Sequence, residues 1–250
     1  MKPGRVAWLA ILAGAVSLTG CDKVTQPTAP DASHTSQPAP PIATPSPVLS
    51  GPERHILALG DSLFAGYGLR PDQAYPPRLE AALRAKGINV RVTNAGVSGD
   101  TTADGLARLN FTLASLQRKP DLVLICLGGN DMLRGLPPEQ MRANLAAILA
   151  QLQQRHIPVV LMGMLAAPNL GKDYAGSFNP IYPALARQYH DALVPFFLSA
   201  VIDRPNLRLA DHIHPTAEGV ERIVRATIDS VARMATSSNL GKLADYRPKI

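Results

Sequence analysis

From residue 55 onward the chain alternates short apolar runs with stretches in which apolar residues recur at helical spacing. Residues 122–127 are apolar throughout, which is typical of a strand covered on both faces. Four other largely apolar runs predict further strands at residues 56–59, 90–92, 159–164 and 193–197. The pattern therefore predicts five strands separated by helices.

The helical stretches show where the predicted helices begin and end. Residues 79–86 read as the end of a helix that stops before Gly87, and Thr101 or Thr102 can cap another that runs to about Gln117. Two further helices are predicted within residues 178–192 and after Thr216. A fifth follows Pro137 and Pro138, which suit a first helical turn. Its inward positions at a period of 3.6 residues are Met141, Leu145, Ile148, Leu149 and Leu152.

Strands that alternate with helices predict an α/β fold with a parallel sheet and helices on both faces. In such sheets, ligands bind beyond the carboxyl ends of the strands, where the strand order reverses. The residues directly after each strand are therefore the first place to look for chemistry.

The N-terminal residues have the pattern of a targeting signal, and we expect them to lie outside the folded domain. Lys2 and Arg5 precede an apolar stretch at residues 6–18, which is long enough for a signal peptide and too short to span a bilayer. The stretch leads into Leu-Thr-Gly-Cys at residues 18–21, which resembles a bacterial lipobox. The pattern predicts a lipoprotein signal peptide over residues 1–21, with lipidation at Cys21.

Proline enrichment marks the next segment. Residues 22–52 hold eight of the 23 prolines, with Ser, Thr, Ala and Gln between them. Such a segment buries too little apolar surface to fold, so we expect a disordered tether. The folded body is then expected over residues 53–237, and residues 238–250 are expected to form a C-terminal tail.

Charge and cysteine content narrow the function classes. The formal net charge is +6, but the 25 basic residues are scattered and no aromatic side chains interleave with a basic run. The sequence therefore predicts no nucleic-acid partner. Two cysteines, Cys21 and Cys126, exclude a disulfide framework and cysteine-based zinc sites. Cys126 lies within the central apolar strand, where we expect a small buried hydrophobe.

Three strand-end loops carry candidate catalytic groups. Gly-Asp-Ser at residues 60–62 places Ser62 at the mouth of a helix, where free N–H groups favour negative charge. Gly99 precedes the second helix and could direct its N–H at a substrate oxygen. Asn130 follows two glycines after the central strand, in a predicted bend, and its side-chain amide could donate to an oxyanion.

A fourth motif lies late in the chain, where Asp211 precedes His214 by three residues. At that spacing the carboxylate can accept from Nδ1 of the imidazole, which leaves Nε2 to take a proton from a serine. His212 competes locally but lies too close to Asp211 for this geometry. No role is assigned to the other histidines.

These four motifs, in this order, resemble the SGNH, or GDSL, hydrolase family over about residues 55–235. The phrase Gly-Asp-Ser-Leu-Phe-Ala-Gly-Tyr-Gly at residues 60–68 and Gly-Gly-Asn-Asp at residues 128–131 are similar to its arylesterase and thioesterase/lysophospholipase branch. The resemblance implies a flavodoxin-like three-layer sandwich with strand order 2-1-3-4-5, and no metal or organic cofactor. It also implies a catalytic triad of Ser62, His214 and Asp211, with an oxyanion hole of Ser62, Gly99 and Asn130.

The substrate follows less directly. Apolar residues after the third and fourth strands predict a pocket for aryl or short-to-medium acyl esters, with thioesters and lysophospholipids as further possibilities: Met132, Leu133, Leu136 and Leu165. Loops over residues 165–178 could move as a lid. The only obvious anion-attracting group nearby is Arg134.

The expected partners are a small-molecule ester and, through the lipid anchor, a membrane. We expect a place in the bacterial cell envelope facing the periplasm, where Asp22 after Cys21 resembles a signal for inner-membrane retention. Three alternatives stay open at this stage. They are deacetylation of envelope glycans, a non-catalytic ligand-binding lipoprotein, and flavin binding by analogy of fold.

Overall fold

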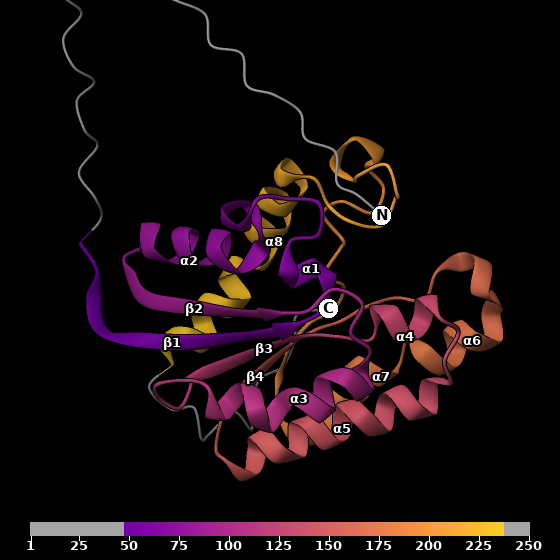
Figure 1. Ribbon diagram of the computed structural model, residues 1–250, viewed down its shortest axis with the longest axis horizontal. Coiled ribbons are helices and arrows are strands. Elements are labelled where there is room, and N and C mark those ends of the chain that lie inside the picture. The colour runs from indigo at the N-terminus through magenta and orange to yellow at the C-terminus, as the bar shows by residue number, and fades with distance from the viewer. Residues whose placement is uncertain (1–47, 238–250) are drawn as a thin grey trace, which may run out of the picture. The chain divides into compact units, whose positions relative to one another are not determined.

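The computed structural model describes residues 48–237, which form one α/β unit around a five-stranded sheet (Figure 1). The strand order is β2-β1-β3-β4-β5, and every neighbouring pair is parallel. The strands are β1 (Ser50–Gly60), β2 (Ile88–Gly96), β3 (Leu122–Cys126), β4 (Val159–Met162) and β5 (Ala192–Val194). The predicted fold class and strand order are confirmed.

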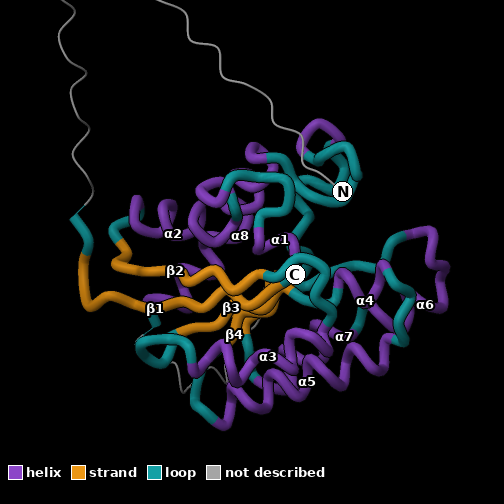
Figure 2. Tube along the Cα trace, in the orientation of Figure 1, coloured by secondary structure: helices purple, strands orange, loops and turns teal. Residues whose placement is uncertain are grey.

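Helices cover both faces of this sheet, as Figures 1 and 2 show. Helices α2 and α8 pack against each other over one face, and α3, α5 and α7 pack over the other. Residues 48–237 contain the α-helices α1 (Ser62–Ala65), α2 (Tyr75–Ala85), α3 (Thr102–Ala114), α4 (Gly129–Leu133), α5 (Pro138–Gln154), α6 (Gly171–Phe178), α7 (Ile181–Tyr189) and α8 (Ala217–Thr236). Short α1 and α4 start at the carboxyl ends of β1 and β3, where the candidate catalytic groups lie.

The outer strands differ most from the apolar runs that predicted them. β1 begins at Ser50, inside the segment predicted as tether, because its N–H and hydroxyl both donate to the carbonyl of Gly87. β2 is also longer than residues 90–92, since its polar residues pair along β1. β5 is shorter than residues 193–197 and ends at Val194, because Pro195 has no N–H to continue the ladder.

The predicted helices are largely confirmed. Thr101 caps α3, with its hydroxyl accepting from the N–H of Asp104, although α3 ends at Ala114 and not near Gln117. Thr216 caps α8, and all five predicted inward positions of α5 are buried. Residues 165–178 were predicted as a segment that lines the pocket and could move as a lid, and no helix was expected within it. The structure places a 3-10 turn at Pro168–Leu170 and helix α6 there.

The core lies on both sides of the sheet, and close backbone approach at its carboxyl edge needs glycine. Cys126 is fully buried in the core, as predicted. A Cβ on Gly96, at the end of β2, would lie 2.3 Å from the backbone nitrogen of Ala65 in α1. Glycine therefore lets β2 press directly against α1, the helix that carries Ser62. Between residues 48 and 237, no helix combines the length and apolar character needed to cross a membrane.

Candidate active site

Ser62 is the first residue of α1 and follows the end of β1 directly. The side chain of Asp61 caps this helix by accepting a hydrogen bond of 2.9 Å from the N–H of Leu63. The N–H of Asp61 donates to the carbonyl of Cys126 at the end of β3. Ser62 is therefore held between the two central strands of the sheet, at a helix N-terminus that favours negative charge.

Asp211 and His214 lie in a loop that Asp211 itself shapes. Its Oδ1 accepts from the backbone N–H groups of Ile213 and His214 at 2.9 and 3.0 Å. The loop is closed by the N–H of Leu209, which donates to the carbonyl of His214 at 2.7 Å. The other carboxylate oxygen, Oδ2, stays available for the imidazole.

The structure joins these two parts in one hydrogen-bonded chain. Nδ1 of His214 lies 2.7 Å from Oδ2 of Asp211, and Nε2 lies 2.7 Å from Oγ of Ser62. The two residues that meet here, Ser62 and His214, are 152 positions apart in the sequence. The ring of Tyr67 lies over the imidazole with 4.4 Å between centroids, and the sequence analysis missed this contact.

The surroundings of Asp211 favour the ionised form of its carboxyl group, which accepts the hydrogen bond from His214. Partial burial raises its pKa, but the N–H of Ile213 and the imidazole and N–H of His214 outweigh burial and lower the pKa to about 2. The carboxylate therefore stays charged through the whole range in which an imidazole changes its protonation. It can hold one tautomer of His214 and stabilise the cation.

Gly99 and Asn130 come from the two neighbouring loops. Asn130 lies in the short helix α4, where a bend was predicted, and its Nδ2 donates to the carbonyl of Asp100 at 3.0 Å. This bond uses one amide hydrogen and fixes the direction of the other. Within residues 48–237 no hydrogen bond occupies the N–H of Gly99 or of Ser62. Three donors are thus available beside the serine.

Two arginines support the Gly99 loop. Arg134, predicted as an anion-attracting group, donates from Nη2 to the carbonyl of Gly99 at 2.7 Å, and its role toward an anion stays a prediction. Arg108 contacts both Asp100 and Gly60, and the sequence analysis did not single it out. A helical arginine next to a buried leucine carries no local signal for this role, because one of its acceptors, the carbonyl of Gly60, lies 48 residues away in the sequence.

Two buried carboxyl groups lie directly beneath the loops. Asp131 accepts from the N–H and hydroxyl of Thr102 at 2.8 and 2.6 Å, which joins α4 to the start of α3. Burial raises the pKa of Asp61 to about 7, and the neighbouring carboxylates of Asp100 and Asp131 act in the same direction. Asp61 is therefore costly to ionise in the folded state.

We expect this burial to make stability depend on pH. The pKa of Asp61 is raised from 3.8 to about 7, so its favourable contribution is complete below about pH 4 and is lost as the pH rises through 7. Asp61→Asn should remove that loss. The measurement is the free energy of unfolding in urea for both proteins. The difference between variant and wild type should shift in favour of the variant by on the order of a few kcal/mol when the pH rises from 4 to 8. Exposed Asp203→Asn is the control, and parallel pH curves for Asp61→Asn and wild type would contradict the expectation.

The predicted pocket residues divide into two kinds. Met132 packs against the core and its sulfur accepts from the N–H of Ala167, while Leu136 is half-buried. Leu133 and Leu165 are exposed. Seven large hydrophobic side chains are exposed among the described residues. Five of them belong to segments that carry a candidate catalytic residue or follow β4, with Leu133 at the end of α4 and the others in loops or turns: Tyr67, Val97, Leu133, Leu165 and Ile213. We call these five residues the apolar rim.

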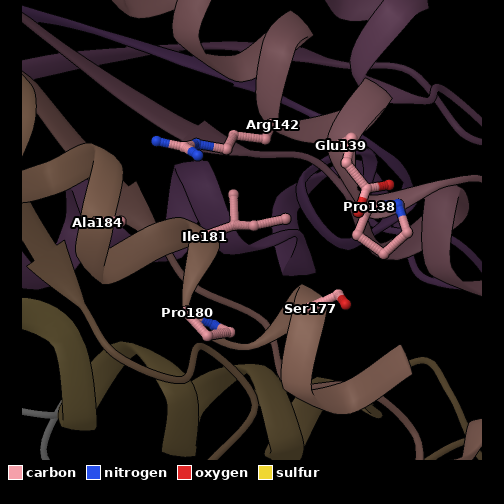
Figure 3. Close-up of a pocket in the computed structure, with 7 residues that line it drawn as sticks. All are labelled: Pro138, Glu139, Arg142, Ser177, Pro180, Ile181 and Ala184. Atoms are coloured by element: carbon pink, nitrogen blue, oxygen red, sulfur yellow. The ribbon is translucent and has the colours of Figure 1, made fainter. Parts of the chain in front are cut away.

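A separate groove of about 240 Å³ lies between α5, α6 and α7 (Figure 3). Its lining comprises Pro138, Glu139, Arg142, Ser177, Pro180, Ile181 and Ala184. None of the predicted catalytic or pocket residues lines it. In the described part of the chain no three His, Cys, Asp or Glu side chains are grouped so that they could hold a metal ion. Cys21 lies outside the described residues.

Comparison with known proteins places this arrangement in a family. Residues 58–222 match the GDSL-like lipase/acylhydrolase family. The chain therefore belongs to this family. An arylesterase of Vibrio mimicus is 44% identical over 163 residues, which cover 65% of this chain and 80% of the relative. The esterase TesA of Pseudomonas aeruginosa is 42% identical over 169 residues, covering 68% and 83%.

The crystal structure of AlinE4, an SGNH-hydrolase family esterase, agrees with the present fold. It matches with a TM-score of 0.64 at 57% identity, over 75% of this chain and all of that chain. The predicted family and enzyme class are confirmed, and this GDSL-family member is a serine esterase that hydrolyses carboxylic esters.

Proposed function

We propose that Ser62 is the nucleophile of this esterase, His214 its general base and Asp211 the orienting carboxylate. The observation that supports this most directly is the continuous chain of two 2.7 Å hydrogen bonds from Ser62 through the imidazole to Asp211. Nothing else in the described residues pairs a hydroxyl, an imidazole and a carboxylate in this order. That order is what acyl transfer by a serine requires.

The proposed reaction proceeds through an acyl-enzyme. Oγ of Ser62 attacks the ester carbonyl while Nε2 of His214 takes the hydroxyl proton. The oxyanion that forms accepts from the N–H groups of Ser62 and Gly99 and from the side-chain amide of Asn130. His214 then gives its proton to the departing alcohol or phenol. Water repeats the sequence on the acyl-enzyme, releases the acid and restores Ser62.

The apolar rim supports aryl or short-to-medium acyl esters as the substrate class, with thioesters and lysophospholipids next. Each of its five side chains is exposed, in a segment that carries a proposed catalytic residue or follows β4, and can cover apolar parts of a substrate. Polar acetylated glycans would gain little from such a surface. The ratio of kcat/KM for naphthyl or p-nitrophenyl esters of two to eight carbons over acetylated glycans tests this preference, and a ratio below one would favour the deacetylase alternative.

The roles of Ser62 and His214 are tested by labelling with a fluorophosphonate probe, which phosphonylates an activated serine. Mass spectrometry should place the label on Ser62 in the wild type. Labelling should be lost in His214→Ala, because the base that removes the hydroxyl proton is gone. His190→Ala, an exposed histidine at the end of α7, is the matched control and should label normally. A label on another residue, or one that persists in His214→Ala, would overturn the assignment.

We further propose that the enzyme is held on the cell envelope, facing the periplasm, by lipid on Cys21. The support is the lipobox-like sequence after the apolar residues 6–18 and the proline-rich segment that follows. Asp22 adds the expectation of inner-membrane retention. Incorporation of a labelled fatty acid that disappears in Cys21→Ala tests the anchor, and unchanged incorporation in that variant would exclude it.

A further inference from the structure

One arginine ties together the loops that hold the proposed oxyanion donors. Arg108 lies in the second turn of α3, and its side chain is 20% exposed. Its Nε donates to Oδ2 of Asp100 at 2.6 Å, and its Nη2 donates to the carbonyl oxygen of Gly60 at 2.9 Å. A single guanidinium therefore contacts the last residue of β1 and the loop after β2.

Each of these two acceptors lies next to a proposed catalytic group. Gly60 is two residues before Ser62, and its carbonyl also accepts from the N–H of Val97 at 3.0 Å. Asp100 directly follows Gly99, and its own carbonyl accepts from the amide of Asn130 at 3.0 Å. The contacts of Arg108 thus lead to all three donors of the proposed oxyanion hole.

The chemistry of the guanidinium suits this role. Nε and one terminal nitrogen share a plane and donate in directions fixed by the group, so two acceptors are held at a set separation. The Asp100 carboxylate is 12% exposed, so water competes weakly for the pair. A lysine keeps the charge but has neither the plane nor the fixed pair of donors.

We infer that Arg108 is a positioning residue for the oxyanion hole of this esterase. By holding Gly60 and Asp100 at a fixed separation, it sets the N–H of Ser62, the N–H of Gly99 and the amide of Asn130 at one point. It touches no reacting atom itself. The inference rests on the proposed roles of those three donors.

The test is a kinetic cycle with the full chain. Arg108→Gln should lower kcat about 10- to 100-fold, less than complete loss of a donor, with KM changed by less than about threefold, because the donors act mainly on the transition state. Arg108→Lys should recover only part of the loss. Arg222→Gln is the matched control, since exposed Arg222 of α8 also pairs with a carboxylate, that of Glu218. It should keep wild-type kcat.

The kcat of the double variant Arg108→Gln/Asn130→Ala distinguishes a positioning role of Arg108 from a merely structural one. If Arg108 acts by placing the amide, its removal should cost much less once the amide is absent, so the two losses should not multiply. Multiplicative losses, or a kcat for Arg108→Gln within twofold of wild type, would overturn the inference.

A second variant and a folding control keep the test decisive if Arg108→Gln folds poorly. Asp100→Asn weakens the same contact from the other side and should lower kcat in the same direction, which covers the case in which Arg108→Gln folds poorly. Circular dichroism and urea unfolding identify the folded variants. If Asn130→Ala alone were fully active, the proposed role of Asn130 in the oxyanion hole would be wrong. If Asn130→Ala had a strongly reduced kcat while Arg108→Gln was fully active, only the positioning role of Arg108 would be wrong.

Discussion

Replacing Ser62 by alanine should lower kcat by about 10⁴-fold or more, which corresponds to about 5 kcal/mol or more of transition-state stabilisation. The variant keeps the donors of the oxyanion hole and the apolar rim but has no atom that can form the acyl-enzyme. Residual turnover by directly attacking water should therefore remain roughly 10³- to 10⁴-fold above the uncatalysed rate. The measurement is kcat and KM on a chromogenic ester, with the variant freed of any contaminating esterase.

The fold should survive this change, because Oγ of Ser62 makes only the bond to His214 and is not part of the core. Circular dichroism and urea unfolding should match the wild type. Ser115→Ala, at the exposed C-terminal end of α3, is the matched control and should keep full activity. A folded Ser62→Ala protein with more than a tenth of wild-type kcat would refute the nucleophile.

Replacing Asn130 by alanine should lower kcat by about 10²- to 10³-fold, or about 3–4 kcal/mol, the usual effect of losing one oxyanion donor. The amide is held by its bond to the carbonyl of Asp100, so its second hydrogen points in a set direction and needs no reordering during the reaction. KM should change little, because a ground-state carbonyl gains less from this donor than the oxyanion does.

The control for this variant is Asn110→Ala, an exposed asparagine of α3 that accepts only from Arg155. It should retain wild-type kcat and KM. The main competing outcome is that Asn130→Ala raises KM and leaves kcat within threefold of wild type. That pattern would make the amide a binding group for substrate and not an oxyanion donor.

The elements found correctly from the sequence are those whose environment is uniform. β3 is buried on both faces, so each of its residues is apolar, and α5 shows one buried stripe at a regular period. The ends of β1 and β2 were missed because polar residues there are stabilised by pairing with each other and not by burial. α6 was missed because Gly171 and Gly176, which favour loops, lie within it.

The candidate site divides in a similar way. Asp211 and His214 are three residues apart, and the contact that joins them is local, so the sequence pattern alone predicts it. The supports of the site are not local. Tyr67 over His214 and Arg108 between Gly60 and Asp100 depend on where separate loops meet, and no spacing along the chain encodes those meetings.

The sequence by itself determined the alternation of strands and helices, because local periodicity encodes it. Short motifs determined the family, the strand order that the resemblance implies, and the candidate catalytic residues. Only the tertiary structure showed that the five side chains of the apolar rim are exposed. It also decided that Oγ of Ser62 lies 2.7 Å from Nε2 of His214, and that Arg134 donates to the carbonyl of Gly99. These are distances between segments far apart in the chain, and they are fixed by the packing of helices on the sheet and by glycines such as Gly96 that allow close approach.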